Sequence, residues 1–375
     1  MPRLCIWMNI PSHYQSAFFQ ALDKREEVDL RVVYFQRPSS HRAAEGWKDD
    51  HRYQPFESSA EGKSSPGEIV ATVPDWRERT HIINGYFSSD LIGFFCANGT
   101  PWCHWSEMPG IRLAELLGYR MPLFRLLNPL MLAGKRGEGR RIKNHALGAF
   151  GQGRLARRAF RAMGVPEQKI ADLYYAPNGL PKAEPCVQVV AFSKGRKVFL
   201  AVGALCRRKG IDLLLKAFAR LDAEGWCLVL CGLDRAEGTY QALAQKLGLG
   251  DRVLFLGAYP VDRISEVYSA ADVFVLPSRF DGWGAVLNEA ASVGLPMVGT
   301  DLCGGSWHVV DEGRTGFRVR ADSVGALAEA MQAYVDNPKL IRKHGDAARA
   351  HFQKSFTPES NAARMLSALR KWGCE

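Results

Sequence analysis

The stretch 272–296 constrains the fold more than any other part of the chain. It begins with an apolar run of strand length that Pro277 closes, passes through a turn containing two glycines, and continues as a helix that Gly294 and Pro296 end. A buried strand that leads through a tight turn into a helix is typical of an open parallel α/β sheet. Such a turn leaves free backbone N–H groups at the positive end of the helix, where an anion can bind.

Two carboxylates stand eight residues apart in this stretch. Asp281 lies in the turn, and Glu289 follows about two helical turns further on. Taken alone, the pair can be one solvated acid and one glutamate on a helix surface. The loops that follow the neighbouring strands favour a binding role instead, as shown below.

Length and composition indicate a soluble protein of two domains. The chain has 375 residues, 47% of them hydrophobic and 23% charged. No apolar run reaches the length of a membrane-spanning helix, and residues 1–14 do not read as a signal peptide. Nine cysteines occur without a C-x-x-C pair, so we expect a cytoplasmic location and no structural metal.

Positive charge is concentrated in one segment. The net charge is +10, and residues 118–161 contain eleven basic residues against a single acid, Glu138. The basic residues are Arg120, Arg125, Lys135, Arg136, Arg140, Arg141, Lys143, Arg154, Arg157, Arg158 and Arg161. Such a block indicates an anionic partner.

An apolar run at 121–132 precedes most of this basic block. An apolar face with a cationic flank is typical of a helix that lies on an anionic membrane, which would place the protein peripherally at the inner face of the cell membrane. A core helix with a solvated basic end is the alternative. The chain shows no nucleic-acid-binding motif, so we expect no nucleic-acid partner.

Strands and helices alternate along the chain, which predicts doubly wound parallel sheets. The expected strands are 4–10, 28–35, 81–84, 102–105, 146–150, 171–176, 198–202, 227–230, 253–256, 272–276, 297–299 and 317–319. The expected helices are 15–24, 88–97, 154–163, 211–221, 240–247, 263–270 and 358–372, with a long loop at 36–66 that can hold one short element and a linker at 177–195. We therefore expect an N-terminal domain at 1–182, a C-terminal domain at 195–356, and a final helical segment, 357–375, that packs back on the N-terminal domain.

Two further loops follow strands of the second half. Gly203 closes the strand 198–202, and Arg208 and Lys209 come directly before the next helix. The forked guanidinium of arginine and the compact ammonium of lysine together suit a diphosphate, although a solvated basic turn would have the same sequence. The loop 300–305 follows another strand. Because the carboxyl ends of parallel strands meet at one edge of the sheet, these loops should converge on one crevice.

These motifs resemble the family 4 glycosyltransferases, the large retaining group with the GT-B fold. The matching runs in the second half are VGALCRRKG (202–210), CGLD (231–234), VLFLGAY (253–259), YSAADVFVLPSRFDGWGAVLNEAASVGLPMVGTD (268–301) and EGRTGFRV (312–319). The first half matches more loosely, at 148–170 and 176–179. The resemblance implies two Rossmann-like domains that face each other across a cleft, with the nucleotide-sugar donor on the C-terminal domain.

The resemblance also implies roles for the two carboxylates. The family's E-x7-E motif falls on Asp281, which would contact the donor sugar, and on Glu289, which would hold the ribose hydroxyls. Two departures stand out: Asp281 is shorter by one methylene than the usual glutamate, and His308 stands where many members carry a glutamate.

Donor phosphates require positive charge. Because Ala204 occupies the position where many members have arginine, the diphosphate pair falls on Arg208 and Lys209. The other expected donor-binding residues are Gly203, Gly282, Trp283 and Gly284. The chain contains no D-x-D sequence, so we expect these cations and the helix N-terminus to neutralise the leaving diphosphate without a metal. We expect no cofactor, and a UDP-sugar donor in preference to a GDP-sugar.

The acceptor should lie on loops of the N-terminal half. His13 follows the first strand, and Glu107 follows the strand 102–105, so both are candidates for assisting acceptor deprotonation or orienting the sugar. Polar residues that line a cleft without a chemical role would look the same.

Together, the sequence predicts a retaining, metal-independent glycosyltransferase acting on a glycan or lipid-linked acceptor in surface polysaccharide or glycolipid biosynthesis. A nucleotide-sugar epimerase of the same fold is one alternative. A nucleotide-sugar-binding protein with weak or no turnover is another, motivated by Asp281 and Ala204.

Overall fold

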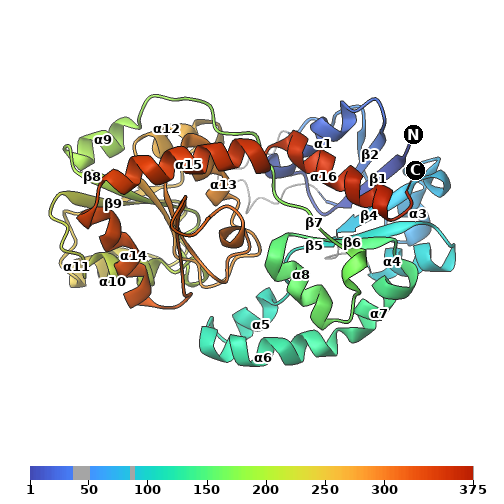
Figure 1. The fold of residues 1–375 in the computed structure, drawn as a ribbon, viewed down its shortest axis with the longest axis horizontal. Helices are drawn as coiled ribbons and strands as arrows, with labels where there is room; N and C mark the ends of the chain where they lie inside the picture. Colours follow the sequence, from blue (N-terminus) through green and yellow to red (C-terminus); the bar gives the residue numbers. More distant parts are fainter. Residues whose placement is uncertain (37–50, 85–88, 375) are drawn as a thin grey trace.

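The computed structural model describes residues 1–36, 51–84 and 89–374, and the chain forms two parallel sheets within them (Figure 1). The first sheet has the order β3 (Glu57–Ser59), β2 (Asp29–Tyr34), β1 (Arg3–Met8), β4 (Thr80–Asn84), β5 (Trp102–Ser106), β6 (Gly148–Gly151) and β7 (Ile170–Asp172). The second has the order β10 (Val253–Gly257), β9 (Trp226–Cys231), β8 (Lys197–Val202), β11 (Val273–Leu276), β12 (Met297–Thr300) and β13 (Gly316–Val319). Two doubly wound domains were predicted from the alternating pattern, and this fold class is confirmed.

Helices cover both faces of the first sheet. The helices of the N-terminal part are α1 (His13–Asp23), α3 (Pro66–Val70), α4 (Ser89–Ala97), α5 (Ile111–Leu116), α6 (Met121–Gly134), α7 (Arg136–His145) and α8 (Gly153–Ala162), with 3₁₀ turns η1 (Trp76–Glu78) and η2 (Glu167–Lys169). Apolar residues of α1 and β1 form one core, and apolar residues of α4, α7 and α8 form another on the opposite face.

The second sheet is covered in the same way. Its helices are α9 (Val187–Ser193), α10 (Ile211–Phe218), α11 (Thr239–Lys246), α12 (Ile264–Ser269), α13 (Val286–Val293), α14 (Val324–Asp336) and α15 (Lys339–Ser355), with 3₁₀ turns η3 (Arg207–Lys209), η4 (Val261–Arg263) and η5 (Gly305–Trp307). Helices α10, α11 and α14 pack on one face, and α9, α12, α13 and α15 pack on the other. Strand β9 is buried along its whole length, as its uninterrupted apolar sequence predicts.

The strand order reverses between β8 and β11 in the second sheet. Loops that leave such a pair of strands at their carboxyl ends diverge to opposite faces, which opens a crevice for a ligand. The loop after β8 carries η3, and the loop after β11 carries the turn 278–284. The predicted donor-binding residues therefore stand at this switch point.

The last helix, α16 (Pro358–Lys371), returns to the N-terminal domain and lies beside α1 (Figure 1). Its buried residues Met365, Leu366 and Leu369 join the same core as Phe18. Asn361 of this helix also accepts from the backbone N–H of Tyr174 and donates to its carbonyl, at 3.0 and 2.9 Å. The chain thus crosses between the domains twice.

One expectation about irregular segments needs correction. The expected linker 177–195 contains α9, in which Val189 is buried in the core of the C-terminal domain while Val187 and Val190 remain exposed. Because apolar residues lie on both the buried and the exposed side of this helix, the sequence shows no helical periodicity that would predict it. The expected loop 36–66 includes the edge strand β3, and residues 37–50 of that loop lie outside the described residues.

Candidate functional site

Asp281 lies in the turn between β11 and α13 and is held by two cations of the loop after β8. Lys209 Nζ lies 2.5 Å from Asp281 Oδ2, and Arg208 Nη1 lies 3.5 Å from the same oxygen. Burial raises the pKa of Asp281, but the two cations outweigh burial and hold the pKa below its ordinary value. The carboxylate is therefore charged at neutral pH, and it organises the two predicted diphosphate ligands.

Arg279 fixes the position of these cations and was not identified from the sequence. Its guanidinium is 4% exposed and makes paired hydrogen bonds of 2.7 Å to Asp212. It also donates to the backbone carbonyl of Arg207 at 2.8 Å and to Asp322 at 2.7 Å. Arg279 thereby ties η3 to the turn. A charged residue three positions after a fully apolar strand was the available signal.

Glu289 is buried in α13, with an exposed fraction of 6%. The hydroxyl of Tyr268 donates to Glu289 Oε2 at 2.6 Å, and Tyr14 of the other domain also bonds to this carboxyl group. Burial raises the pKa of Glu289 to about 7, although both tyrosines favour the charged form. Neither tyrosine was identified from the sequence, because nothing local marks them as partners of a glutamate so far along the chain.

Both glycines of the turn are required by their surroundings. A side chain on Gly282 would overlap the carboxylate of Glu107, which reaches the turn from the N-terminal domain. Gly284 has φ +80°, and a Cβ there would lie 2.7 Å from the side chains of Leu276 and Cys303. The structure therefore brings Glu107 against the turn that carries Asp281.

Glu107 is itself bonded within its own domain. Tyr175 donates its hydroxyl to Glu107 Oε1 at 2.8 Å. Burial raises the pKa of Glu107, and the neighbouring charge of Asp281 raises it further, so this carboxyl binds a proton more readily than an exposed glutamate.

The remaining predicted residues lie around this centre. His13 is the first residue of α1 and is exposed, with its ring 3.9 Å from that of Tyr14. Gly203 follows β8 with φ +134° and lies next to the Lys209 side chain. Trp283 is only 1% exposed and donates its Nε1–H to Asn288. Because its ring is covered, Trp283 can offer a ligand only its backbone in this arrangement.

The covered ring of Trp283 belongs to a contact between the domains. It stacks on Tyr174, with ring centroids 5.3 Å apart, and on His308, at 5.9 Å. His308 Nε2 accepts the backbone N–H of Arg154 at the start of α8, at 2.7 Å. Burial lowers the pKa of His308 to about 4, so the ring is neutral and able to accept. Position 308, where many members of the resembled family carry a glutamate, is thus occupied by a histidine whose ring links the loop after β12 to α8.

The arrangement combines positive charge with hydroxyl-binding groups. Arg208 and Lys209 suit a diphosphate, and a buried carboxylate such as Glu289 suits paired hydroxyls. Within the ranges 1–36, 51–84 and 89–374, no group of three or more His, Cys, Asp and Glu side chains is placed to hold a metal ion.

Comparisons with known proteins show sequence relatives of the second half of the chain. Residues 186–351 match the family described as glycosyl transferases group 1. The chain is 29% identical over 201 residues to a D-inositol 3-phosphate glycosyltransferase of Corynebacterium glutamicum, covering 52% of this chain and 48% of the relative. It is 33% identical over 178 residues to the lipopolysaccharide core biosynthesis mannosyltransferase LpcC of Rhizobium leguminosarum, covering 45% and 49%. The chain thus spans about half the length of these curated relatives.

Solved structures extend the likeness to the whole fold. Sucrose-phosphate synthase from Thermosynechococcus elongatus has a TM-score of 0.73 at 20% identity and covers 99% of both chains. Anabaena HepE in complex with UDP and glucose has a TM-score of 0.70 at 15% identity, covering 98% of this chain and 99% of that one. The fold is that of the GT-B glycosyltransferases, and the predicted resemblance is confirmed.

Proposed function

We propose that this chain, whose residues 186–351 match the group 1 glycosyltransferases, transfers a sugar from a nucleotide-sugar donor to a glycan or lipid-linked acceptor. We infer that the transfer retains the configuration of the sugar and needs no metal. The observation that carries the proposal is the joint placement of Lys209, Arg208 and Asp281 beside the helix that bears Glu289, at the switch point of the second sheet.

The site residues divide between the parts of the donor. Arg208 and Lys209 neutralise the diphosphate, so Lys209 exchanges its contact with Asp281 for a phosphate oxygen. Glu289 accepts the ribose hydroxyls in place of the hydroxyl of Tyr14. Glu107 stands on the acceptor side. Because Tyr14 and Glu107 both belong to the N-terminal domain, the two domains must separate slightly to admit the donor.

A UDP-sugar is the preferred donor. The support is that HepE, which shares the fold, was solved in complexes with UDP and with UDP-glucose. A panel of UDP- and GDP-sugars screened by thermal shift tests this choice, because a ligand that binds only the folded state raises the melting temperature. UDP-sugars should raise it more than GDP-sugars. A larger shift with GDP-sugars would reverse the assignment of the base.

Affinity for UDP-glucose is expected to rise roughly tenfold between about pH 5.5 and about pH 7.5. The pKa of Glu289 is about 7 without ligand, so the carboxyl group is protonated at the lower pH, and ribose hydroxyls must displace that proton to donate to it. The stability of the unliganded protein should instead fall as pH rises from 4.5 toward 7. The reason is that Glu289 binds a proton more tightly in the folded state than in the unfolded state.

Calorimetry across this pH range measures the dependence. UDP-glucose is the suitable probe because its diphosphate is esterified at both ends and lacks the ionisation near pH 6 of a terminal phosphate. Glu289→Gln supplies the control and should bind with little dependence on pH. An equal slope in this variant would assign the proton to another group.

Transfer activity is expected to persist in excess EDTA. Arg208, Lys209 and the N-terminus of α13 supply positive charge for the departing nucleoside diphosphate. The assay compares initial rates of transfer before and after chelation. A complete loss that Mg²⁺ or Mn²⁺ restores would contradict a metal-free diphosphate site.

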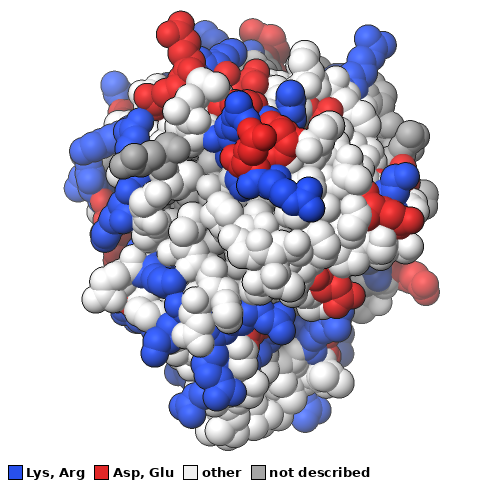
Figure 2. Space-filling model, turned by 90° about the vertical axis from the view of Figure 1, so that its right-hand side faces the viewer, with Lys and Arg blue, Asp and Glu red and all other residues white. Residues whose placement is uncertain are grey.

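The basic segment 118–161 is partly neutralised, by Glu138 inside it and by acids elsewhere in the chain that the composition of the segment does not show. Arg125 pairs with Asp301, Lys135 with Glu138, and Arg157 and Arg161 with Glu167. In the described part of the chain, the other seven basic residues form no ion pair with a carboxylate: Arg120, Arg136, Arg140, Arg141, Lys143, Arg154 and Arg158. Figure 2 shows Lys and Arg outnumbering acidic residues over the lower part of the face it presents.

An exposed apolar stripe adjoins these free cations. Leu126 and Leu130 of α6 are 69% and 70% exposed, and Leu123 lies on the same side of the helix. Among the described residues, no helix is both long and apolar enough to cross a bilayer. Exposed leucines beside free arginines fit a helix that lies on an anionic membrane surface, so we propose reversible attachment to the inner face of the cell membrane.

Binding to vesicles that contain anionic lipid is expected at low salt, and added salt should weaken it by screening. Each basic residue near the surface contributes about 1 kcal/mol. Reversal of Arg136, Arg140 and Arg141 to glutamate should therefore release the protein from vesicles in a sedimentation assay while nucleotide binding stays unchanged. If the unaltered protein fails to sediment with anionic vesicles, the membrane proposal is wrong.

A further inference from the structure

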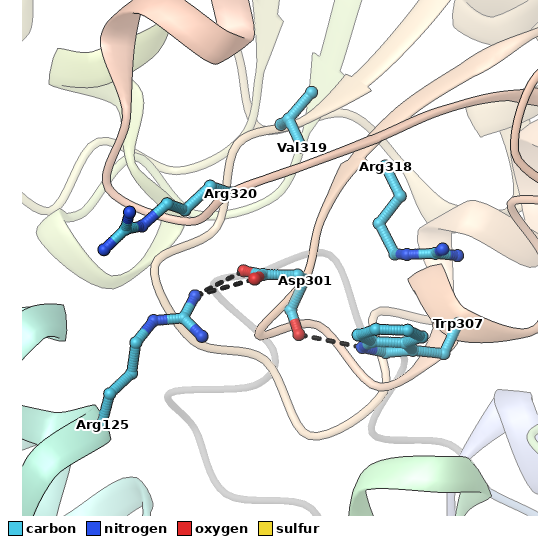
Figure 3. A pocket seen from close by; sticks show the side chains of 6 residues that line it. All are labelled: Arg125, Asp301, Trp307, Arg318, Val319 and Arg320. Atoms are coloured by element: carbon cyan, nitrogen blue, oxygen red, sulfur yellow. Dashed lines mark hydrogen bonds and ion pairs between the residues drawn. The ribbon is translucent and has the colours of Figure 1, made fainter.

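A cavity of about 330 Å³ lies between α6 and the end of β13, separate from the residues around Asp281 and Glu289. It is lined by Arg125, Asp301, Trp307, Arg318, Val319 and Arg320. In Figure 3, Arg125 and Arg320 approach it from one side, and Arg318 lies against Trp307 on the other. Its volume is within the range of small-molecule sites.

The lining carries an excess of two positive charges, because three arginines face a single carboxylate. Asp301 is engaged by Arg125, whose Nη2 lies 2.7 and 2.9 Å from its two oxygens, and by the backbone N–H of Ala321 at 2.9 Å. Among the described residues, neither the Arg318 nor the Arg320 guanidinium has a carboxylate partner, and that of Arg318 donates only to the carbonyls of Ser306 and Val310, both at 3.4 Å. These two guanidinium groups are therefore available to an anion.

Trp307 holds further positive charge beside the cavity. The guanidinium carbon of Arg318 lies 4.1 Å from the centroid of the Trp307 ring, and that of Arg154 lies 4.5 Å from it. The ring is fixed by a hydrogen bond of 2.9 Å from its Nε1 to the carbonyl of Asp301. An arginine stacked on a fixed ring keeps its donors oriented, which reduces the entropy lost when an anion binds.

A second cavity of about 200 Å³ shares Arg125 and Arg320 with the first. It also touches Met121, Pro122 and Ala321, so it offers apolar contacts beside the cationic cavity. Residues of α6 line both cavities, and the outer side of α6 carries the exposed leucines. A molecule held by an anionic group in the first cavity therefore has room for an uncharged part along α6.

We propose that the cationic cavity binds a phosphate group carried by the acceptor. A phosphate monoester has close to two negative charges at neutral pH, which matches the excess on the lining, and its oxygens suit the forked donors of arginine. This inference rests on the proposed transferase function. A lipid phosphate and a soluble sugar phosphate present the same group, and the experiment distinguishes them.

Calorimetry with glycerol 1-phosphate, in the presence of saturating UDP, tests the site. Arg320→Gln is the main variant, because this exposed side chain has no hydrogen bond or ion pair among the described residues, so its loss should leave folding intact. We expect about tenfold weaker binding, the effect of one lost charge-assisted hydrogen bond. Arg314→Gln is the matched control, because Arg314 is an exposed arginine before the start of β13, outside the cavity lining, and pairs with Asp311; this variant should bind as the unaltered protein does.

Asp301→Asn should change the affinity in the opposite direction. The amide oxygen can still accept the N–H of Ala321, but the competing negative charge is lost, so we expect glycerol 1-phosphate to bind severalfold more tightly. General damage to the protein would not produce this gain. A loss of affinity in Asp301→Asn would overturn the proposal.

The source of the phosphate is tested with dihexanoyl phosphatidic acid at concentrations below micelle formation. Tighter binding of this lipid than of glycerol 1-phosphate indicates a lipid phosphate, and equal binding indicates a soluble one. The site is overturned if glycerol 1-phosphate does not bind, or if Arg208→Gln removes its binding while Arg320→Gln does not. UDP affinity is measured separately in each variant, so a failure of the donor site is seen independently.

Discussion

Replacement of Glu289 by alanine is expected to weaken UDP binding by a factor of about 30 to 1,000. The proposed contact joins two ribose hydroxyls to one buried carboxylate, and charge-assisted hydrogen bonds contribute about 1.5–3 kcal/mol each before relaxation of the site is considered. Glu289 has an exposed fraction of only 6%, so little water is available to replace the lost acceptor. Calorimetric titration with UDP measures the change.

Two variants separate this effect from damage to the fold. Glu289→Gln keeps an acceptor for the hydroxyl of Tyr268 and should show a smaller loss than the alanine variant. Glu329→Ala removes an exposed glutamate from α14 and should bind UDP normally. If folded Glu289→Ala binds UDP as tightly as the unaltered protein, the ribose assignment is wrong.

Replacement of Asp281 by alanine is expected to lower kcat by about 10²–10³-fold, the usual effect of removing one group that acts on charge developing in a transition state. Affinity for the nucleotide should stay within a few-fold or increase. The reason is that Lys209 and Arg208, which now face Asp281, become free for the diphosphate. A fall in kcat without a matching loss of affinity identifies a contact made mainly in the transition state.

Steady-state kinetics measures the fall in kcat, and titration with UDP measures the nucleotide affinity separately. Asp251→Ala is the matched control. Asp251 is exposed just before β10, at the amino ends of the strands, whereas the switch point lies at their carboxyl ends. If Asp281→Ala turns over within a few-fold of the unaltered protein, the turn has a structural role only.

The fold and the centre of the site could be predicted from local patterns. Strand, glycine turn and helix are each encoded by neighbouring residues, so the turn around Asp281 was placed correctly. The contact between Lys209 and Asp281 joins distant parts of the chain, but both loops leave neighbouring parallel strands at the same edge. The sheet topology thus predicts that these two residues meet, although they are far apart in the sequence.

Contacts between the domains could not be predicted in this way. Tyr14 reaches Glu289, and Glu107 reaches Gly282, only because the two sheets face each other at one particular angle. No periodic pattern encodes that angle, which depends on the packing of many side chains. The pairing of Arg125 with Asp301 was missed for the same reason, so the basic segment looked less neutralised than it is.

Acceptor-dependent release of nucleoside diphosphate tests the central proposal most directly. The protein is incubated with a UDP-sugar, with and without candidate glycan and lipid-linked acceptors, and free UDP and the configuration of the product are followed. We expect UDP release only when an acceptor is present, a product that retains the anomeric configuration of the donor, and release that is about 10²–10³-fold slower in Asp281→Ala. An isomerised donor formed without acceptor would contradict the account in favour of an epimerase. Donor binding without release, whichever acceptor is supplied, would contradict it in favour of a protein that only binds.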